Sequence, residues 1–168
     1  KIKNLLSKIN ISTQFLFLQK DRVTSEKSRV IASHQQVVRY DIESNEDINK
    51  ASAHSIIEAY KSIIEDYDII LLSDYGKGVL TYDLTQSVIN IAHVHHKKVL
   101  VDPKGMDYSK YKGAYLLTPN KKEASEASQI NINSKKSLLQ AIKKIKKQFN
   151  LSISIITLSE QGVAIFDD

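Results

Sequence analysis

Four short segments of this sequence combine carboxylate, amide, hydroxyl and ammonium groups with glycine or proline. They are Ser73–Gly78, Asp102–Gly105, Thr118–Asn120 and Thr157–Gly162. A lysine attracts a phosphate group as a point charge, and glycine allows backbone N–H groups to approach the anion closely. These residue types therefore favour a site for phosphate-bearing molecules, provided that the fold brings the segments together.

Each polar segment follows a short apolar run that is typical of a buried strand. The runs are Asp68–Asp74, Lys98–Asp102, Ala114–Thr118 and Ile153–Thr157. Between them lie the helical patterns Thr81–His96, Asn120–Ser128 and Ser134–Phe149. This alternation predicts an α/β fold with a mostly parallel sheet and helices on both of its faces. Ligands bind beyond the carboxyl ends of parallel strands, so we expect the polar segments to meet along one edge.

The first 66 residues follow a different pattern. Helical periodicity covers residues 1–10, and a second helix is expected from Ser44 to about Asp66, with capping residues at Ser44–Asp47. Three extended segments with mixed polar and apolar residues lie between these helices, at residues 14–19, 27–34 and 36–42. They predict a small antiparallel layer over residues 13–43, separate from the α/β core at 44–168.

Each polar segment also has a purely structural interpretation. The glycines of Asp74–Gly78 can serve a turn alone, and Asp102–Gly105 fits an ordinary turn. Asn120 and Glu123 have the spacing of a helix capping box, which explains them as well as a Mg²⁺–phosphate role does. Ser159–Gly162 can be a hairpin loop. No single motif is specific, so the functional prediction depends on their order at successive strand ends.

Composition argues against several other classes of protein. The net charge of +5 comes largely from lysines at positions 135–147, on the polar side of an amphipathic helical pattern. We interpret them as a solvated face and expect no nucleic-acid partner. The chain has no cysteine and no run near the roughly 18 apolar residues that span a bilayer, so we expect a cytoplasmic protein without a membrane partner.

Two further site types are not expected. The spacing of His93, His95 and His96 does not place their rings on one helix face, which favours solvated histidines over a metal site. The sequence also lacks a P-loop pattern and a G-x-G-x-x-G pattern, so nucleotide binding by those devices is excluded.

Five stretches of the sequence together resemble the ribokinase-like (PfkB) carbohydrate kinases. They are Lys27–Arg29 with His34–Asp41, Leu72–Leu80, Val101–Gly105, Tyr111–Glu123 and Thr157–Gly162. Within this family the sequence is most similar to kinases of D-glycero-β-D-manno-heptose 7-phosphate. Leu158 departs from the family pattern, in which an arginine is common at this position.

The resemblance implies a reaction and a set of roles. ATP, with Mg²⁺, would phosphorylate the anomeric hydroxyl of the heptose phosphate, giving heptose 1,7-bisphosphate on the way to ADP-heptose and the lipopolysaccharide core. The residues implied in sugar-phosphate binding are Arg29, Gln35, Gln36, Arg39, Asp74, Lys77 and Lys104. Those implied at the nucleotide are Asn120, Glu123, Thr157, Ser159 and Gly162, with Glu123 acting indirectly on Mg²⁺. The antiparallel segments at residues 13–43 would be part of a lid over the sugar, and this lid would also form a homodimer contact.

The resemblance further implies that the catalytic base lies outside these 168 residues. The family's N-terminal Gly-Gly segment and C-terminal Gly-Ala-Gly-Asp segment are both expected beyond this chain, which would be the central part of one kinase domain and inactive alone. Two alternatives remain open. One is a ribokinase-like enzyme for a hexose phosphate or a nucleoside, and the other is a non-catalytic sugar- or nucleotide-binding module.

Overall fold

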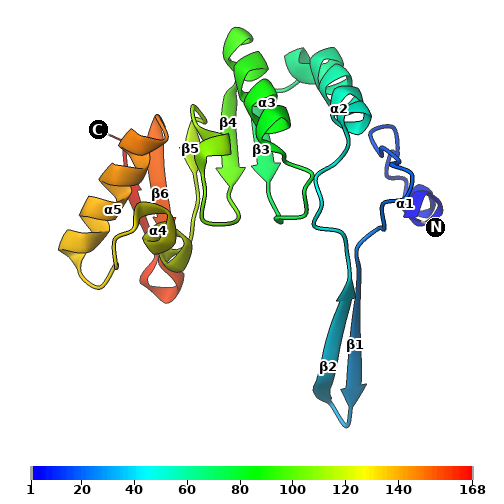
Figure 1. The fold of residues 1–168 in the computed structure, drawn as a ribbon, viewed down its shortest axis with the longest axis horizontal. Helices are drawn as coiled ribbons and strands as arrows, with labels where there is room; N and C mark the ends of the chain where they lie inside the picture. The colour runs from blue at the N-terminus through cyan, green and yellow to red at the C-terminus, as the bar shows by residue number, and fades with distance from the viewer. Residues whose placement is uncertain (1, 168) are drawn as a thin grey trace.

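The computed structural model describes residues 2–167 and contains two sheets that are well separated in space (Figure 1). The larger sheet has the strand order β3-β4-β5-β6-β7. Its strands are β3 (Ile69–Ser73), β4 (Lys98–Asp102), β5 (Leu116–Leu117), β6 (Ile153–Thr157) and β7 (Val163–Phe166). Strands β3 to β6 are parallel, and β7 returns antiparallel to β6. The predicted parallel sheet is confirmed.

Helices precede and connect the parallel strands. They are α2 (Lys50–Ile63), α3 (Tyr82–Val94), α4 (Lys121–Ser128) and α5 (Lys135–Gln148), with short 3-10 turns η1 (Ile64–Asp66), η2 (Ser109–Tyr111) and η3 (Ser159–Gln161). Thr81, Asn120 and Ser134 cap α3, α4 and α5 with their side chains, and the cap at Asn120 is the one that its spacing to Glu123 indicated. None of the helices in residues 2–167 has both the length and the apolar character needed to cross a bilayer.

The core forms where one face of the sheet meets these helices. Val99, Val101 and Ile156 on the strands are almost completely buried, and Ile89 of α3 and Ile145 of α5 are equally inaccessible. Full burial of an aliphatic side chain of this size stabilises a fold by about 1.5–3 kcal/mol. This apolar layer fixes the positions of the strand ends from which the polar segments begin.

The prediction of helices on both sheet faces is wrong for the described residues. Neighbouring strands follow one another in the chain, and right-handed crossovers in one direction put every connecting helix on the same side. The other face leaves Ile69 and Leu71 of β3 at 53% and 68% exposure, and Val163 and Ile165 of β7 at 56% and 64%. Helices therefore cover only one face here.

The smaller sheet is a two-stranded antiparallel ribbon that projects from the body (Figure 1). β1 (Glu26–Ala32) and β2 (Gln35–Ile42) are joined by Ser33 and His34, which both have positive φ. Such a two-residue turn matches the right-handed twist of the ribbon strands. The predicted antiparallel layer is thus confirmed for two strands.

Two expectations about the N-terminal part are wrong. Residues 14–19 form no strand, and α2 begins at Lys50, capped by Asn49, rather than at Ser44. The cause of the late start is tertiary, because the backbone N–H of Ile48 donates to Gly78 O at 2.8 Å. The preceding residues are thereby held in an irregular path. The helix expected at residues 1–10 is present as α1 (Ile2–Lys8).

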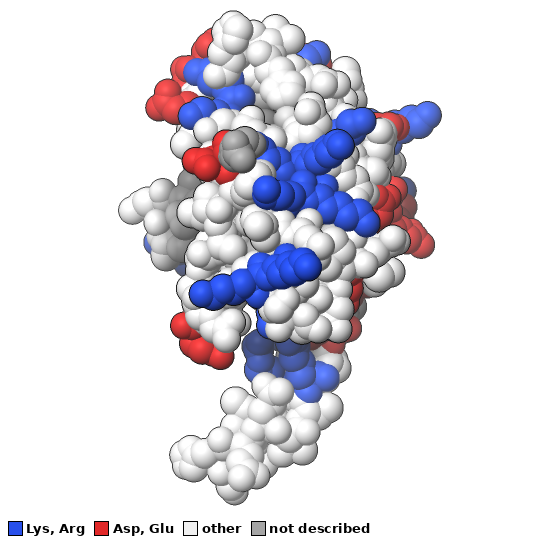
Figure 2. All heavy atoms as spheres, turned by 90° about the vertical axis from the view of Figure 1, so that its left-hand side faces the viewer, with Lys and Arg blue, Asp and Glu red and all other residues white. Residues whose placement is uncertain are grey.

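The lysine-rich pattern forms the amphipathic helix α5. Ala141, Ile142 and Ile145 are buried against the sheet, whereas most of its lysines are exposed. Figure 2 shows basic side chains gathered on this side of the molecule. Lys143 and Lys146 lie 4.9 Å and 5.5 Å from the centre of the Phe166 ring, within the range of cation–π attraction.

Candidate functional site

The loops after β3, β4, β5 and β6 form one continuous rim at the carboxyl edge of the sheet. Backbone N–H of Asp74 donates to Asp102 O at 3.0 Å, which joins the first two loops. Lys104 Nζ reaches Glu123 Oε1 at 3.1 Å, joining the second loop to the start of α4. Thr157 N–H donates to Pro119 O at 2.9 Å, joining the last two. Contacts therefore link all four polar segments in sequence.

Asp74 is the most deeply buried charged group of this rim, with a side chain 3% exposed. Its Oδ2 accepts hydrogen bonds from Lys110 Nζ and Tyr111 OH, both at 2.6 Å, and its Oδ1 accepts from the Gly76 N–H at 2.7 Å. Burial alone would raise the pKa of Asp74, but these donors outweigh it and lower the pKa. Asp74 is therefore an ionised carboxylate whose acceptors are already engaged.

The loop from Asp74 to Leu80 is held tightly by its neighbours. Gly76 and Gly78 have φ of 64° and 71°, a region that glycine occupies without strain. A Cβ at Gly78 would lie 1.9 Å from Glu46 O, so no other residue fits without a backbone shift. Arg22 donates to Glu46 O at 2.7 Å and also contacts Lys77 O. Arg22 and Glu46, which lie just before β1 and just after β2, thus hold this loop in place.

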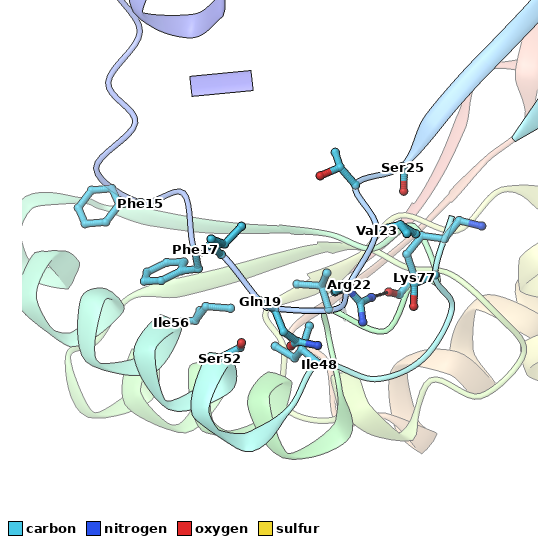
Figure 3. Close-up of a pocket in the computed structure, with 14 residues that line it drawn as sticks. Phe15, Phe17, Gln19, Arg22, Val23, Ser25, Ile48, Ser52, Ile56 and Lys77 are labelled. Carbon is cyan, nitrogen blue, oxygen red and sulfur yellow. Dashed lines mark hydrogen bonds between the residues drawn. The ribbon is translucent and has the colours of Figure 1, made fainter. Parts of the chain in front are cut away.

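The Lys77 side chain points toward the residues that directly follow β2 rather than into the core. Its Nζ pairs with Glu43 Oε1 and donates to Asn45 Oδ1 at 3.2 Å. It also lines a cavity of about 510 Å³ (Figure 3), where Phe15, Phe17 and Ile56 form apolar walls and Arg22 contacts the backbone of Lys77. Lys77 is therefore the ammonium group that could exchange Glu43 for a ligand anion.

Asn120 and Glu123 form the capping box that the structural interpretation predicted. Asn120 Oδ1 accepts from Glu123 N–H at 3.0 Å, and Glu123 Oε2 accepts from Asn120 N–H at 3.1 Å. The Glu123 ion pair raises the pKa of Lys104. The second carboxylate oxygen of Glu123 faces Lys104 on the rim, so capping and a ligand role do not exclude each other.

A magnesium ion fits this donor set only in one way. Within residues 2–167 no group of three His, Cys, Asp or Glu side chains is arranged to hold a metal. Mg²⁺ that arrives on nucleotide phosphates keeps several waters and needs only one or two protein carboxylates. Glu123 is the carboxylate on this rim that could meet that requirement through water, in exchange for its contact with Lys104.

The segment Thr157–Gly162 is the hairpin between β6 and β7. Leu158 N–H donates to Gly162 O at 2.8 Å, and Ser159 and Gly162 adopt positive φ. Thr157 forms a parallel bridge with Asn120, which places this hairpin beside the start of α4. Thr157, Asn120 and Glu123 are thus brought together, whereas Ser159 and Gly162 lie at the exposed end of the hairpin.

The ribbon residues predicted to bind the sugar are not next to this rim. Arg29 pairs directly with Arg39 across the ribbon, and Gln35 and Gln36 lie near its tip, away from the body (Figure 1). Arg39 donates to both carboxylate oxygens of Asp41, at 2.9 Å and 2.6 Å. The hydrogen bond and charge of Asp41 raise the pKa of Arg39. The structure therefore separates these four residues from Asp74 and Lys77.

The clustered histidines have local roles. The Nε2 of His93 lies 2.9 Å from Gly113 O, and the Nδ1 of His95 lies 2.5 Å from Glu65 Oε1. These partners lie on different elements, as expected for rings that do not share a helix face.

Sequence reasoning did not identify Lys110, Tyr111, Glu43 or Arg22. Lys110 and Tyr111 lie on η2, which is too short for a periodic pattern to reveal. Tyr111 belongs to a family-like stretch, but no role was expected for it. Glu43 and Arg22 act through contacts with a loop more than 30 residues away in sequence, which no local pattern encodes.

Comparison with known proteins identifies relatives along the entire chain. The pfkB family carbohydrate kinase profile matches residues 1–168. The bifunctional protein HldE of Aliarcobacter butzleri is 58% identical over 168 residues, and that of Campylobacter fetus is 49% identical over 168 residues. The HldE protein of Helicobacter pylori is 40% identical over 164 residues, which are 98% of this chain. The chain spans 35% of the A. butzleri protein and 36% of the other two.

Solved structures show the same fold at low sequence identity. Phosphofructokinase-2 from Escherichia coli in complex with potassium aligns with a TM-score of 0.73 and 19% identity, over 98% of this chain and 53% of that one. Arabidopsis thaliana ribokinase complexed with ribose and ATP aligns with a TM-score of 0.56 and 17% identity, over 78% of this chain and 42% of that one. With the profile match over its full length, this chain belongs to the pfkB family of carbohydrate kinases.

Proposed function

We propose that the intact protein containing this chain uses ATP to phosphorylate D-glycero-β-D-manno-heptose 7-phosphate at its anomeric hydroxyl, in the cytoplasm, as a step toward ADP-heptose. The observation that carries the proposal is the continuous rim of Asp74, Lys104, Asn120 and Thr157 at one sheet edge. Relatives named bifunctional protein HldE, at 40–58% identity, support the choice of sugar.

The sugar phosphate would bind at the β3 end of the rim. Lys77 provides the ammonium group, and its present partner Glu43 would be displaced by the incoming phosphate. Lys104 adds a second positive charge from the neighbouring loop.

The nucleotide would bind at the β6 end of the rim. Asn120 and Thr157 lie side by side there, with Ser159 and Gly162 on the adjoining hairpin. Glu123 would orient Mg²⁺ through water, and Mg²⁺ when bound neutralises phosphate charge. This chain positions both substrates, and the base that accepts the sugar hydroxyl proton would come from outside it.

The ribbon would close over the sugar from a second copy of the chain. Its β2 residues Val38, Tyr40 and Ile42 form one face and are 48%, 55% and 52% exposed. Isolated two-stranded ribbons are marginally stable, so this apolar face needs a cover. A homodimer through the ribbon would supply it.

The opposite ribbon face suits a phosphate. Arg29 and Arg39 are directly paired there, and like charges directly opposite each other are destabilising. Asp41 already pairs with Arg39, and a bound phosphate would offset the remaining repulsion between the two guanidinium groups. In the dimer, Arg29 and Arg39, with Gln35 and Gln36 farther along, could reach a bound sugar phosphate.

The test is a kinase assay of the intact protein with ATP and Mg²⁺. Heptose 7-phosphate, fructose 6-phosphate and ribose are offered in parallel, and the products are identified by ³¹P NMR. We expect a 1,7-bisphosphate from the heptose at a kcat/KM at least about a hundredfold above the other sugars. Equal or better turnover of fructose 6-phosphate would contradict the substrate assignment, and the absence of any turnover would support a binding module.

A further inference from the structure

The 3-10 turn η2 between β4 and β5 contacts two loops of the rim through adjacent side chains. Tyr111 is fully buried, donates to Asp74 Oδ2, and accepts a hydrogen bond from the Lys104 N–H at 3.2 Å. Burial, together with the bonded Asp74 carboxylate, raises the pKa of Tyr111, so the phenol remains a donor. Both the β3 loop and the β4 loop are thereby attached to η2.

Lys110 spans the loop that carries Lys77. Its Nζ lies 2.6 Å from Asp74 Oδ2 at the start of the loop and 3.0 Å from Leu80 O at its end. The ammonium group therefore fixes the distance between the two ends of the loop. At 22% exposure its side chain is shielded from water, which strengthens an ion pair relative to one on the surface.

The turn η2 is itself anchored to the body of the fold. Gln86 of α3 donates from Nε2 to Lys110 O and to Lys112 O, both at 3.0 Å. Asp107 Oδ1 accepts a hydrogen bond from the Ser109 N–H at the start of the turn, at 2.8 Å. Lys110 thus holds the loop against a rigid support rather than against another mobile segment.

We propose that Lys110 is the positioning residue of the sugar-phosphate loop, and that it acts by clamping Asp74 and the Leu80 carbonyl so that Lys77 is presented to the substrate. Lys110 touches no reacting atom in this role. The inference rests on the proposed function, because it assigns Lys77 to the sugar phosphate.

The clamp also explains why Asp74 is buried without a free acceptor. A carboxylate in direct contact with sugar hydroxyls would need an open oxygen, whereas both oxygens of Asp74 already accept hydrogen bonds. Asp74 then acts through the loop, as the anionic partner of Lys110.

The test compares three variants of the intact protein. Lys110→Met keeps the apolar stem and removes the charge, Lys110→Arg keeps a cation with several donors, and Lys112→Met is a control at an exposed neighbouring lysine. We expect Lys110→Met to raise the KM for the sugar phosphate on the order of tenfold or more, with the KM for ATP changed less than about twofold. Lys110→Arg should restore the sugar KM to within about threefold, and Lys112→Met should behave as wild type.

Two results would overturn the role of Lys110. One is an unchanged sugar KM in folded Lys110→Met, and the other is an equal rise in both KM values with no rescue by arginine. If Lys110→Met does not fold, the double variant with Asp74→Asn removes the unpaired buried charge and should fold while keeping the raised sugar KM. Normal sugar binding by that double variant would equally refute the clamp.

A second readout separates this inference from the proposed function. Hydrogen exchange of the amides in residues 76–80 should accelerate in Lys110→Met and not in Lys112→Met, whatever the substrate is. Faster exchange in an intact protein that phosphorylates no sugar would overturn the proposed function and leave the clamp in place. Unchanged exchange in an active kinase would overturn the clamp alone.

Discussion

Replacing Gly78 by alanine tests how closely the loop that carries Lys77 packs against the residues that directly follow β2. A Cβ there would lie 1.9 Å from Glu46 O and 2.8 Å from the backbone nitrogen of Asp47. Real Cβ contacts are essentially never shorter than 3.0 Å, so the two backbone segments, around Gly78 and around Glu46, would have to move apart by about 1 Å. Both contacting atoms belong to the backbone, so no side-chain rotation relieves them.

The expected loss of stability has three parts. Alanine at a φ of 71° costs about 1 kcal/mol relative to glycine. Moving the two backbone segments apart disrupts the 2.8 Å hydrogen bond from Ile48 N–H to Gly78 O, which contributes about 1 kcal/mol. Forced repacking adds about 1–3 kcal/mol. We therefore expect the free energy of unfolding to fall by about 4 kcal/mol.

The assay is urea unfolding of the intact protein followed by circular dichroism, with Gly105→Ala as the matched control. Gly105 also has a positive φ, 92°, but a Cβ there meets no atom within 4 Å. It should lose only the backbone part, about 1 kcal/mol. If the two variants lose the same stability to within about 0.5 kcal/mol, the packing of this loop against residues 46–48 is wrong.

Three further predictions concern charge. The pKa of Asp74 is lower in the folded protein than in the unfolded chain. Its contribution to stability is therefore complete above the unfolded pKa and is lost as the pH falls through the folded pKa. In Asp74→Asn, the free energy of unfolding should consequently depend less on pH below about pH 4. An unchanged acid limb would show that Asp74 is not an ionised buried partner. Tyr40→Asp places a charge on the apolar face of the ribbon and should shift the intact protein from dimer to monomer in analytical ultracentrifugation. The control Lys27→Gln, on the other face, should remain a dimer. If the Tyr40→Asp variant is also a dimer, the ribbon is not the dimer contact. Glu123→Gln retains a capping side chain but removes a charge, so the Mg²⁺ concentration for half-maximal activity should rise on the order of tenfold. An unaltered Mg²⁺ dependence would remove Glu123 from the metal site.

The α/β core could be predicted from sequence because local signals and tertiary packing agree there. Val99, Val101 and Ile156 lie in apolar runs, and they are buried as those runs predict. Asn120 and Ser134 precede helical patterns, and each caps its helix. Parallel strands then place their loops at one edge by geometry alone.

The remainder depends on contacts between distant segments. The start of α2 was predicted at Ser44 from capping residues, but the hydrogen bond from Ile48 to Gly78 prevents helix formation before Asn49. Lys110 reaches Asp74 over 36 residues from a single 3-10 turn, so neither periodicity nor spacing indicates it. The uncovered sheet face was missed because an apolar strand pattern does not tell which face a helix of the same chain will cover.

The candidate site shows why two interpretations of one motif can both hold. Asn120 and Glu123 were equally compatible with a capping box and with a ligand role, and the capping box is present on the rim itself. The roles of Arg29 and Arg39 stay predictions that require a second chain, because the ribbon holds them away from Asp74.

We propose that two phosphate-bearing substrates share the carboxyl edge of β3 to β6. A crystal structure of the intact protein with heptose 7-phosphate and a non-hydrolysable ATP analogue would show where each ligand binds. We predict the sugar phosphate at Lys77, with Glu43 released, and the nucleotide beside Asn120 and Thr157. Either ligand bound at the amino-terminal edge of the sheet, or on its uncovered face, would contradict the account.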